Sequence, residues 1–355
     1  MAGEGKYRVI QWATGNVGTR AMRAVVEHPD MELAGLWVSN PDKAGLDAAR
    51  LVERDVGYEG TCPDTGVIAS QSTADMVATS ADCVLYMRQG TDIDELCQLL
   101  ASGKNVVTTR GDFHDPASMD PETRERIEEA CAAGNSSIYS TGSSPGFITE
   151  AMLLPIVSMS RQLDCVTIDE YADMTSRNSP DLIFNIMGYG VSVGQFDQRR
   201  VDYVKHDFAA SLAQVAKAIG LEIDEWRAFG ELSGANSTVQ IAAGTIEAGT
   251  VGAQRITIEG VKDGKPRLRF RANWYCTTDI EHDDWNLRES GWKVVVEGGT
   301  PMEVNITFPV DEATYPSVTP GFTAHRAVNA IPAVCAAAPG IRTTADMEHV
   351  LARFS

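Results

Sequence analysis

The stretch "RVIQWATGNVGTRAMRAVVEHPD", residues 8–30, contains the pattern that decides the fold. It begins with an apolar run ending at Trp12, which is typical of a buried strand. Two glycines, Gly15 and Gly18, follow with two residues between them. Helical periodicity then continues as far as Pro29, a residue that ends helices. The stretch therefore predicts a buried strand, a tight glycine turn and a helix.

Short apolar runs alternate with helical segments through the first 145 residues. Further strands are predicted at "MELAGLWV", "DCVLYM", "NVVTT" and "SSIYST". Helices are predicted at "DIDELCQLLASG" and "PETRERIEEACAAG", each ended by its glycine. Continuous apolar strands that alternate with helices favour a parallel sheet covered on both faces. We therefore expect an α/β fold, with a Rossmann-type doubly wound parallel sheet, over residues 1–145.

The pattern changes at about Thr149 and becomes rich in strands. The segments "DCVTIDEYAD", "TVQIAAGTIEAGTVGAQRITIEGVKDGKPRLRFRANWYC" and "GWKVVVEGGTPMEVNITFPV" predict strands, with "KDGK" as a hairpin turn. One helix, "FAASLAQVAKAIG", lies among them. We expect an α+β domain with a mostly antiparallel sheet over residues 146–320. The last segment, "FTAHRAVNAIPAVCAAAPG", predicts one apolar helix ended by Pro339 and Gly340.

The bulk composition excludes several classes of function. The 355-residue chain has a net charge of −19 and an isoelectric point near 4.7, which would repel a nucleic-acid backbone. No run of about 18 apolar residues predicts a membrane span. The N-terminal "MAGEGKYRVI" lacks the apolar core of a signal peptide. We expect a cytoplasmic protein with no nucleic-acid or membrane partner.

Cysteine and histidine spacing indicates neither a disulfide framework nor a metal site. The seven cysteines are scattered without a CxxC pair, and this favours a reducing compartment. The six histidines show no HxH or HxxxH spacing, so we expect no bound metal.

The glycine turn is the candidate cofactor site. It has the GxGxxG pattern with alanine at the first position, on the first strand–helix turn of a series of βαβ units, and that context supports dinucleotide binding. Backbone amides at the start of the helix would bind a diphosphate. The residues expected to contact the cofactor there are Ala13, Thr14, Gly15, Asn16, Val17 and Gly18.

The end of the second strand bears on the choice of nucleotide. Sites that prefer NAD usually have Asp or Glu there to bind the ribose hydroxyls. This chain instead has Ser39, Asn40 and, after Pro41 and Asp42, Lys43. A hydroxyl and an ammonium suit a 2′-phosphate, so the sequence favours NADP, with NAD the alternative.

Several motifs together resemble one family. The motifs "WATGNVG", "SNPDKAG", "GKNVVTT", "TGSSPGF", "HDFAASLAQVAKAIG", "AAGTIEAGTVGAQ" and "AVNAIPAVCAAAPGIRT" occur in the order found in 2,4-diaminopentanoate dehydrogenases and native amine dehydrogenases. Such chains are also called dihydrodipicolinate-reductase-like. The HHxxxK-type signature of true dihydrodipicolinate reductase is absent here.

The resemblance covers nearly the whole chain and implies an architecture and an activity. It implies a Rossmann domain that the C-terminal segment 321–355 rejoins, and a substrate-binding and dimerisation domain. It also implies NAD(P)-dependent oxidative deamination of a small amine to a ketone or aldehyde, or the reverse. A homodimer is implied as well, with the segment from Thr238 to Cys276 as a candidate interface.

The sequence departs from the family at the expected catalytic position. The family pattern has two adjacent acidic residues after the strand "GKNVVTT", and one of them is catalytic. Here Gly111 takes the first place and only Asp112 remains, so Asp112 is the candidate catalytic carboxylate. A carboxylate in a partly dry pocket suits the proton transfers of amine oxidation. The alternatives are that Asp112 caps a helix, or that His114 acts as acid or base.

Further candidates lie at strand ends and in the second domain. Arg88 and Gln89 follow "DCVLYM", where Arg88 contacts the nicotinamide or a substrate carboxylate, or else forms a loop salt bridge. Thr109 and Ser143 are the other predicted cofactor contacts, with Pro145 and Phe147 starting the next helix. The predicted substrate contacts are Arg110, Phe147, Glu170, Tyr171 and Arg177.

The leading hypothesis is an NADP(H)-dependent oxidoreductase that acts on a C–N bond. Two alternatives remain open: reduction of a different imine or carbonyl, and a catalytically silent protein that senses NADP. A nucleophilic cysteine is disfavoured, because Cys83 lies in a predicted buried strand and Cys131 in a predicted helix.

Overall fold

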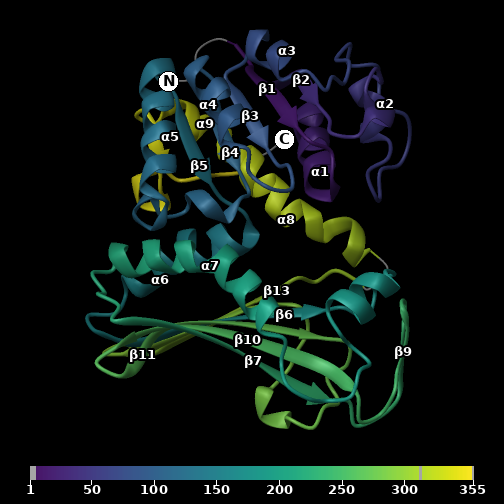
Figure 1. Ribbon diagram of the computed structural model, residues 1–355, viewed down its shortest axis with the longest axis vertical. Coiled ribbons are helices and arrows are strands. Elements are labelled where there is room, and N and C mark those ends of the chain that lie inside the picture. The colour runs from purple at the N-terminus through teal and green to yellow at the C-terminus, as the bar shows by residue number, and fades with distance from the viewer. Residues whose placement is uncertain (1–4, 312–313, 354–355) are drawn as a thin grey trace. The chain divides into compact units, whose positions relative to one another are not determined.

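The computed structural model describes residues 5–311 and 314–353 (Figure 1). The chain forms two compact units. The first comprises the residues up to Phe147 together with those from Ser317 onward, and the second is Ile148–Pro316. Among the described residues, no helix is long and apolar enough to cross a membrane.

The first unit is built on a six-stranded parallel sheet, in the order β14-β5-β4-β3-β1-β2. Its strands are β1 (Tyr7–Trp12), β2 (Met31–Trp37), β3 (Cys83–Tyr86), β4 (Asn105–Thr108), β5 (Ser137–Ser140) and β14 (Gly340–Arg342). The first five correspond to the apolar runs read from the sequence. The α/β prediction with a Rossmann-like sheet is therefore confirmed.

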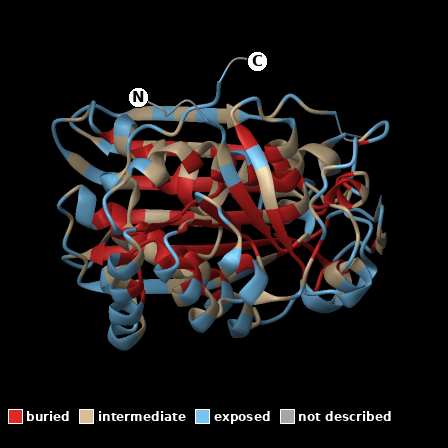
Figure 2. Cartoon of the chain, turned by 90° about the horizontal axis from the view of Figure 1, so that it is seen from above, coloured by how far each residue is buried: buried red, intermediate tan, exposed pale blue. Residues whose placement is uncertain are grey.

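Helices pack on both faces of this sheet. They are α1 (Asn16–Glu27), α2 (Ala48–Val52), α3 (Thr73–Ala78), α4 (Ile93–Ala101), α5 (Pro121–Gly134), α8 (Tyr315–Asn329) and α9 (Ile331–Ala336). Alternate strand residues serve the two faces: Ile10 packs with α4 and α5, and Val9 packs with α1, α8 and α9. Figure 2 shows the buried residues concentrated in the strands and on the inner faces of the helices.

Helix α5 ends at Gly134 as predicted, and the left-handed residue Asn135 (φ 51°) follows as its C-cap. Two local predictions were wrong. The last apolar segment is two helices rather than one, since α8 ends at Asn329 and α9 begins at Ile331, and residues 340–342 then add strand β14 beside β5. No helix starts at Pro145, because residues 144–146 have non-helical backbone angles.

The second unit contains a six-stranded mixed sheet, in the order β13-β12-β6-β11-β10-β7. Its strands are β6 (Leu163–Asp173), β7 (Glu225–Gly234), β10 (Val251–Lys262), β11 (Lys265–Tyr275), β12 (Gly291–Gly298) and β13 (Met302–Thr307). All pairs are antiparallel except β6 with β11. The "KDGK" turn joins β10 to β11 as predicted, with positive φ at Asp263 and Gly264. A separate ribbon pairs β8 (Val239–Ile241) with β9 (Gly244–Ile246).

The two faces of the mixed sheet differ in chemistry. The helix α7 (Gln198–Ala218) packs on one face, where Phe208 stacks on Phe270 with ring centroids 4.2 Å apart. The short α6 (Leu153–Val157) precedes β6. The opposite face is polar and includes the ion pairs Arg269–Glu259 and Arg271–Asp169. One face is thus an apolar core and the other a layer of paired charges.

Candidate active site

The turn between β1 and α1 has the geometry of a phosphate cradle. Gly15 is the N-cap of α1, and a Cβ built on it would meet nothing within 4 Å. A Cβ on Gly18 would lie 2.4 Å from the carbonyl oxygen of Ala13, so only glycine fits there. The first turn of α1 contains no acidic residue and receives no side-chain cap within the described residues. Its amides therefore face open space at the positive end of the helix, which fits the diphosphate of a dinucleotide.

Ala13 occupies the first glycine position of the pattern in a left-handed conformation. Its φ is 74°, a region that costs a residue with a Cβ about 1–2 kcal/mol. Its carbonyl oxygen accepts a hydrogen bond of 2.9 Å from Nε2 of the fully buried Gln11. Gln11 therefore holds the cradle in its strained shape. The sequence pattern did not single out Gln11.

Lys43 lies against the cradle. Its Nζ donates to both the carbonyl oxygen and the Oγ1 of Thr14, each at 2.9 Å. Burial lowers the pKa of Lys43, and the nearby charge of Arg54 lowers it further. An ammonium has three donors, and one remains beyond the two bonds to Thr14. The segment after β2 thus brings the ammonium of Lys43 into contact with the cradle.

Ser39 and Asn40 take part in local bonds at the end of β2. The carbonyl oxygen of Ser39 accepts from Nε2 of Gln71 at 2.9 Å. The side chain of Asn40 caps the short 3₁₀ turn at residues 41–43 by accepting from the amide of Asp42 at 2.9 Å. These bonds fix the direction in which the chain leaves β2, and the Ser39 hydroxyl is left to meet a ligand.

Arg88 forms an ion pair, so the structure favours the salt-bridge interpretation of this residue. Its guanidinium donates to Oε2 of Glu95 at 2.5 Å and lies 5.5 Å from the ring centroid of Trp37. Gln89, the next residue, is exposed. The ion pair fixes Arg88 beside the aromatic residues at the carboxyl end of the sheet.

Sequence reasoning missed an aromatic group at the ends of three strands. Trp12, Trp37 and Tyr86 are the last residues of β1, β2 and β3, and they lie in register. The rings of Trp12 and Trp37 stack with centroids 4.9 Å apart and an interplanar angle of 8°. Their shared position at the ends of adjacent predicted strands was the available signal. They form a rigid floor beside the cradle.

Asp112 is held by two neighbours at the carboxyl end of the parallel sheet. Oγ1 of Thr91 donates to its Oδ2 at 2.7 Å, and Nε of Arg110 lies 3.6 Å from the same oxygen. Its side chain is about 29% exposed. Thr91 follows β3 and Asp112 follows β4, so loops from two neighbouring strands fix this carboxylate. Ligands of open α/β sheets bind at this edge.

The capping alternative belongs to other acids of the same segment. Asp115 caps the short turn at residues 116–118, and Asp120 caps α5. Asp112 caps neither of them. His114, the alternative acid or base, is buried.

The loop after β5 is tied to α8. Oγ of Ser143 lies 2.7 Å from Oγ1 of Thr323, and the guanidinium of Arg326 lies 5.9 Å from the ring centroid of Phe147. Thr109 is half-buried directly after β4. These residues lie in the first unit with the cradle.

The predicted substrate residues of the second unit do not share one surface. Glu170 and Tyr171 are neighbours on β6, so their side chains lie on opposite faces of the sheet. Glu170 accepts hydrogen bonds from the indoles of Trp274 and Trp292. Tyr171 is on the polar face, with the guanidinium of Arg288 at 5.2 Å from its ring centroid.

Arg177 lies in the turn after β6. Its amide donates to the carbonyl oxygen of Met174 at 3.1 Å. Burial raises the pKa of Tyr315, and the charge of Arg177 opposes that shift. Arg177 is therefore near Tyr315. The guanidinium that lies over the ring of Tyr171 is that of Arg288.

Neither of the two cysteines considered as nucleophiles is activated. Cys83 is fully buried in β3, and burial raises the pKa of its thiol. Burial also raises the pKa of Cys131 to about 12. A thiol at neutral pH is a poor nucleophile. In residues 5–311 and 314–353 no group of three or more His, Cys, Asp or Glu side chains is arranged to hold a metal ion.

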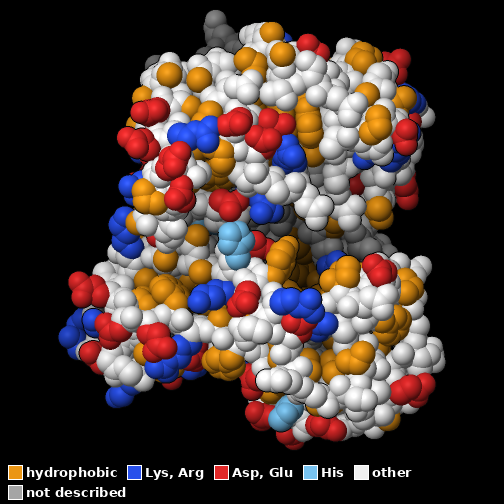
Figure 3. All heavy atoms as spheres, viewed as in Figure 1, with side chains coloured by type: hydrophobic (Ala, Val, Ile, Leu, Met, Phe, Trp, Pro, Cys, Tyr) orange, Lys and Arg blue, Asp and Glu red, His pale blue; other side chains and the backbone are white. Residues whose placement is uncertain are grey.

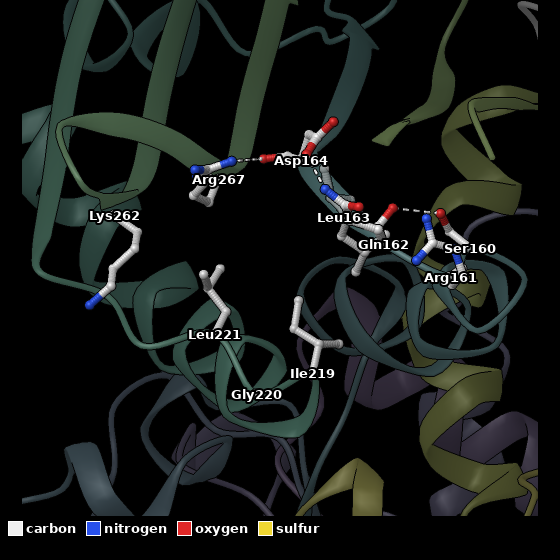
Figure 4. Close-up of a pocket in the computed structure, with 11 residues that line it drawn as sticks. Ser160, Arg161, Gln162, Leu163, Asp164, Ile219, Gly220, Leu221, Lys262 and Arg267 are labelled. Carbon is white, nitrogen blue, oxygen red and sulfur yellow. Dashed lines mark hydrogen bonds between the residues drawn. The ribbon is translucent and has the colours of Figure 1, made fainter. Parts of the chain in front are cut away.

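The second unit contains a cavity of about 550 Å³ at the end of β6 opposite to Glu170 (Figure 4). It is lined by Arg161, Lys262 and Arg267 among others, and Arg267 donates to the carbonyl oxygen of Asp164 at 3.0 Å. Asp164 stands at the start of β6 and Glu170 near its end, roughly 20 Å apart at strand spacing. The cavity is thus separate from the candidate substrate residues of the second unit.

Comparison with known proteins decides the family. The family model described as the 2,4-diaminopentanoate dehydrogenase C-terminal domain matches residues 147–354. The chain belongs to this family. A protein named amine dehydrogenase from Streptomyces virginiae is 28% identical to this 2,4-diaminopentanoate dehydrogenase family member over 352 residues, 95% of each chain.

Solved structures share the fold of this family member. The amine dehydrogenase of Mycobacterium smegmatis matches with a TM-score of 0.73 at 17% identity, covering 99% of this chain and 98% of that one. A probable dehydrogenase from Thermotoga maritima matches with a TM-score of 0.56 at 14% identity, over 96% and 92% of the two chains. The chain is an NAD(P)-dependent oxidoreductase, and its cofactor is a nicotinamide dinucleotide.

Proposed function

We propose that this enzyme catalyses NADP(H)-dependent oxidation of an amine at a C–N bond, or the reverse reductive amination. The observation that carries the proposal is the position of Asp112, which Thr91 holds at the carboxyl edge of the sheet that contains the phosphate cradle. The name of the Streptomyces relative, an amine dehydrogenase, supports the choice of a C–N bond.

The chain's own residues would bind the cofactor and move protons. The amides at the start of α1 bind the diphosphate, and the nicotinamide supplies the hydride acceptor. Asp112 would accept a proton from the ammonium and release it to solvent. It would then accept a proton from the water that attacks the iminium and return it to the departing nitrogen. The overall reaction converts R₂CH–NH₃⁺, NADP⁺ and water into R₂C=O, NH₄⁺, NADPH and a proton.

The preference for NADP rests on the cations beside the cradle. Lys43 has a remaining donor, Arg54 adds charge, and the hydroxyl of Ser39 lies at the end of β2. Within residues 39–43 the one acidic side chain is the exposed Asp42. A 2′-phosphate is favoured by this balance of charge, whereas NAD sites use a carboxylate to bind the ribose hydroxyls.

Contacts to the substrate are proposed within each unit separately. In the first unit Arg110 follows β4 and Phe147 lies in the segment after β5. In the second unit Glu170 is near the end of β6 and Arg177 follows it. Tyr171 lies on the opposite face of the mixed sheet from Glu170, so its proposed contact is a separate one.

A homodimer is proposed through the polar face of the mixed sheet. This face carries matched ion pairs and also Phe229, an exposed aromatic residue. Light scattering is expected to give twice the 38.3 kDa chain mass, and Phe229→Lys is expected to give one chain mass. A native mass of 38.3 kDa would end this part of the proposal.

Gly111 favours a second candidate function, reduction of a different imine or carbonyl. The first acidic position of the family pattern is a buried glycine here, so this segment has one carboxylate where the pattern implies two. Because that change removes a proton acceptor, it suits a reaction that needs less proton transfer.

The deciding experiment follows NADPH oxidation by absorbance. The purified enzyme is mixed with ammonia and a panel of ketones and aldehydes, with and without the ammonia. Turnover that requires ammonia and is abolished in Asp112→Asn supports the proposal. Turnover without ammonia supports the carbonyl reductase, and tight NADPH binding with no turnover supports a sensor.

A further inference from the structure

We propose that Glu170 is the group that binds the cationic nitrogen of the substrate, in a subsite walled by Trp274, Trp292 and Phe308. This inference rests on the proposed function, because it assigns the amine of that reaction to a place in the second unit. The substrate class it predicts is a primary ammonium carried on an apolar group.

Glu170 lies on the central strand of its part of the sheet, with one indole from each neighbouring strand. Nε1 of Trp274 on β11 donates to its Oε1 at 3.3 Å, and Nε1 of Trp292 on β12 donates to its Oε2 at 3.2 Å. Register places these residues on the same face, the one on which α7 packs. The two indoles therefore fix both oxygens of the carboxylate.

The charge of Glu170 has no cationic partner among the described residues: no Lys, Arg or His nitrogen lies within 4.0 Å of it. The adjacent Asp169 differs, since Arg271 donates to both of its oxygens at 2.5 and 2.7 Å. A half-buried carboxylate loses free energy of solvation, and the two neutral indole N–H groups restore only part of it without supplying a counter-charge. A cationic ligand would supply that charge.

The carboxylate keeps the capacity to accept further hydrogen bonds. Two oxygens offer about four acceptor positions, and the two indoles use two of them. An ammonium group brings three donors and a full positive charge. A neutral ketone brings neither, so the subsite distinguishes the amine from its carbonyl product.

Two indole rings contact the carboxylate, and a third ring packs on one of them. The ring of Phe308 meets that of Trp292 edge-on, with centroids 4.8 Å apart. Trp274 is half-buried and packs against an apolar group of residues that includes Met174 and Ile183. Aromatic faces attract cations and also accept apolar surface. The walls therefore suit the hydrocarbon part of the substrate as well as its nitrogen.

The test measures binding of n-butylammonium to the full chain without cofactor, by calorimetry and by the fluorescence of the tryptophans. We expect Glu170→Gln to weaken this binding at least tenfold and to leave the weak binding of butan-1-ol unchanged. Glu170→Asp, which keeps the charge, is expected to fall between the two. Glu303→Gln is the matched control, because its carboxylate is paired with Lys293 in the same sheet, and it should bind as the wild type does.

Two outcomes would overturn the inference: equal affinity of wild type and Glu170→Gln for n-butylammonium, or equal affinity of the wild type for butan-1-ol and n-butylammonium. If Glu170→Gln does not fold, Glu170→Asp and Trp274→Phe carry the test, and unchanged binding in both would overturn it. Turnover of amines with an unchanged KM in Glu170→Gln refutes the subsite but keeps the proposed function. Selective ammonium binding without any turnover of amines supports the subsite and refutes the proposed function.

Discussion

Lys43 and Thr14 are joined by two hydrogen bonds of 2.9 Å, from one ammonium to the carbonyl and the hydroxyl oxygen of the same residue. The contact links the segment after β2 to the phosphate cradle after β1. The first segment is expected to bind the ribose of the adenosine and its 2′-phosphate, and the second is expected to bind the diphosphate. If the proposed preference for NADP is correct, this one side chain contacts the diphosphate-binding turn and also binds the 2′-phosphate.

Lys43→Met should therefore affect the two cofactors unequally. We expect the affinity for NADPH to fall about tenfold or more, which is about 1.4 kcal/mol, and the affinity for NADH to fall only severalfold through loss of the bonds to Thr14. Fluorescence titration with both nucleotides measures this, with Lys6→Met, an exposed lysine, as control. Equal losses for the two nucleotides would limit Lys43 to a structural role. Arg54→Met tests the second cation in the same way.

Gly15 and Gly18 should respond differently to alanine. In Gly18→Ala the new methyl would lie 2.4 Å from the Ala13 oxygen. We therefore expect the variant to lose about 1–3 kcal/mol of folding stability and also to bind the cofactor more weakly. Gly15→Ala meets no atom within 4 Å, and its backbone is in an extended region open to any residue. We expect wild-type stability but weak cofactor binding, because the methyl takes the space of the diphosphate. Urea unfolding measures the stability of both variants, and titration measures their cofactor affinity. Wild-type cofactor affinity in Gly15→Ala would contradict the proposal that this turn binds the diphosphate.

Asp112→Asn should reduce catalysis and leave cofactor binding intact. General acid–base catalysis contributes typically about 10²–10⁴-fold, and we expect kcat to fall within that range. Thr91→Val removes the bond to Oδ2 but keeps the acid, so a smaller fall is expected. Asp115→Asn is the control, because Asp115 caps a turn in the same segment. If Asp112→Asn retained the wild-type kcat, another residue would have to transfer the proton.

Asp47 should give stability that depends on pH. Burial opposes the shift, but hydrogen bonds from Ala49, Thr65 and Gly66 hold the pKa of Asp47 below its usual value. A depressed folded-state pKa adds stability that is complete above the unfolded value, about 3.9, and is lost as the pH falls through the folded value. We expect Asp47→Asn to cost about 1–3 kcal/mol at pH 7 and less near pH 3.

Urea unfolding of both proteins at the two pH values measures the effect of Asp47. Asp42→Asn, an exposed carboxylate in the same segment, should change little at either pH. A cost for Asp47→Asn that does not shrink on acidification would show that its hydrogen bonds do not depend on the charge.

Local signals predicted the strand–turn–helix unit almost residue by residue, because apolar runs and glycines act within a few positions of one another. Strand β14 was missed, since three residues carry no periodicity and only the neighbouring β5 makes them a strand. The salt bridge of Arg88 was left open, because the choice of Glu95 as partner depends on how the loop before α4 folds.

The candidate site also contains some features that local sequence predicts and others that depend on tertiary structure. The cradle follows from spacing alone, whereas Glu170 became distinctive only when register brought Trp274 and Trp292 beside it from distant parts of the chain. Neighbouring residues of a strand point to opposite faces of the sheet, so the sequence alone could have shown that Tyr171 and Glu170 lie on different faces. The excess of acidic residues carried little information, since Figure 3 shows acidic and basic side chains interspersed over the visible surface.

Strand β14 also has a consequence for synthesis of the protein on the ribosome. The sheet that holds the cradle needs residues 340–342 for its edge, and the whole of Ile148–Pro316 is translated between the two parts. At about 5–20 residues per second, the emerging N-terminal strands wait on the order of 10–40 s with the edge of β5 uncovered. Chaperones that protect nascent chains therefore have a defined target and a defined interval in this enzyme.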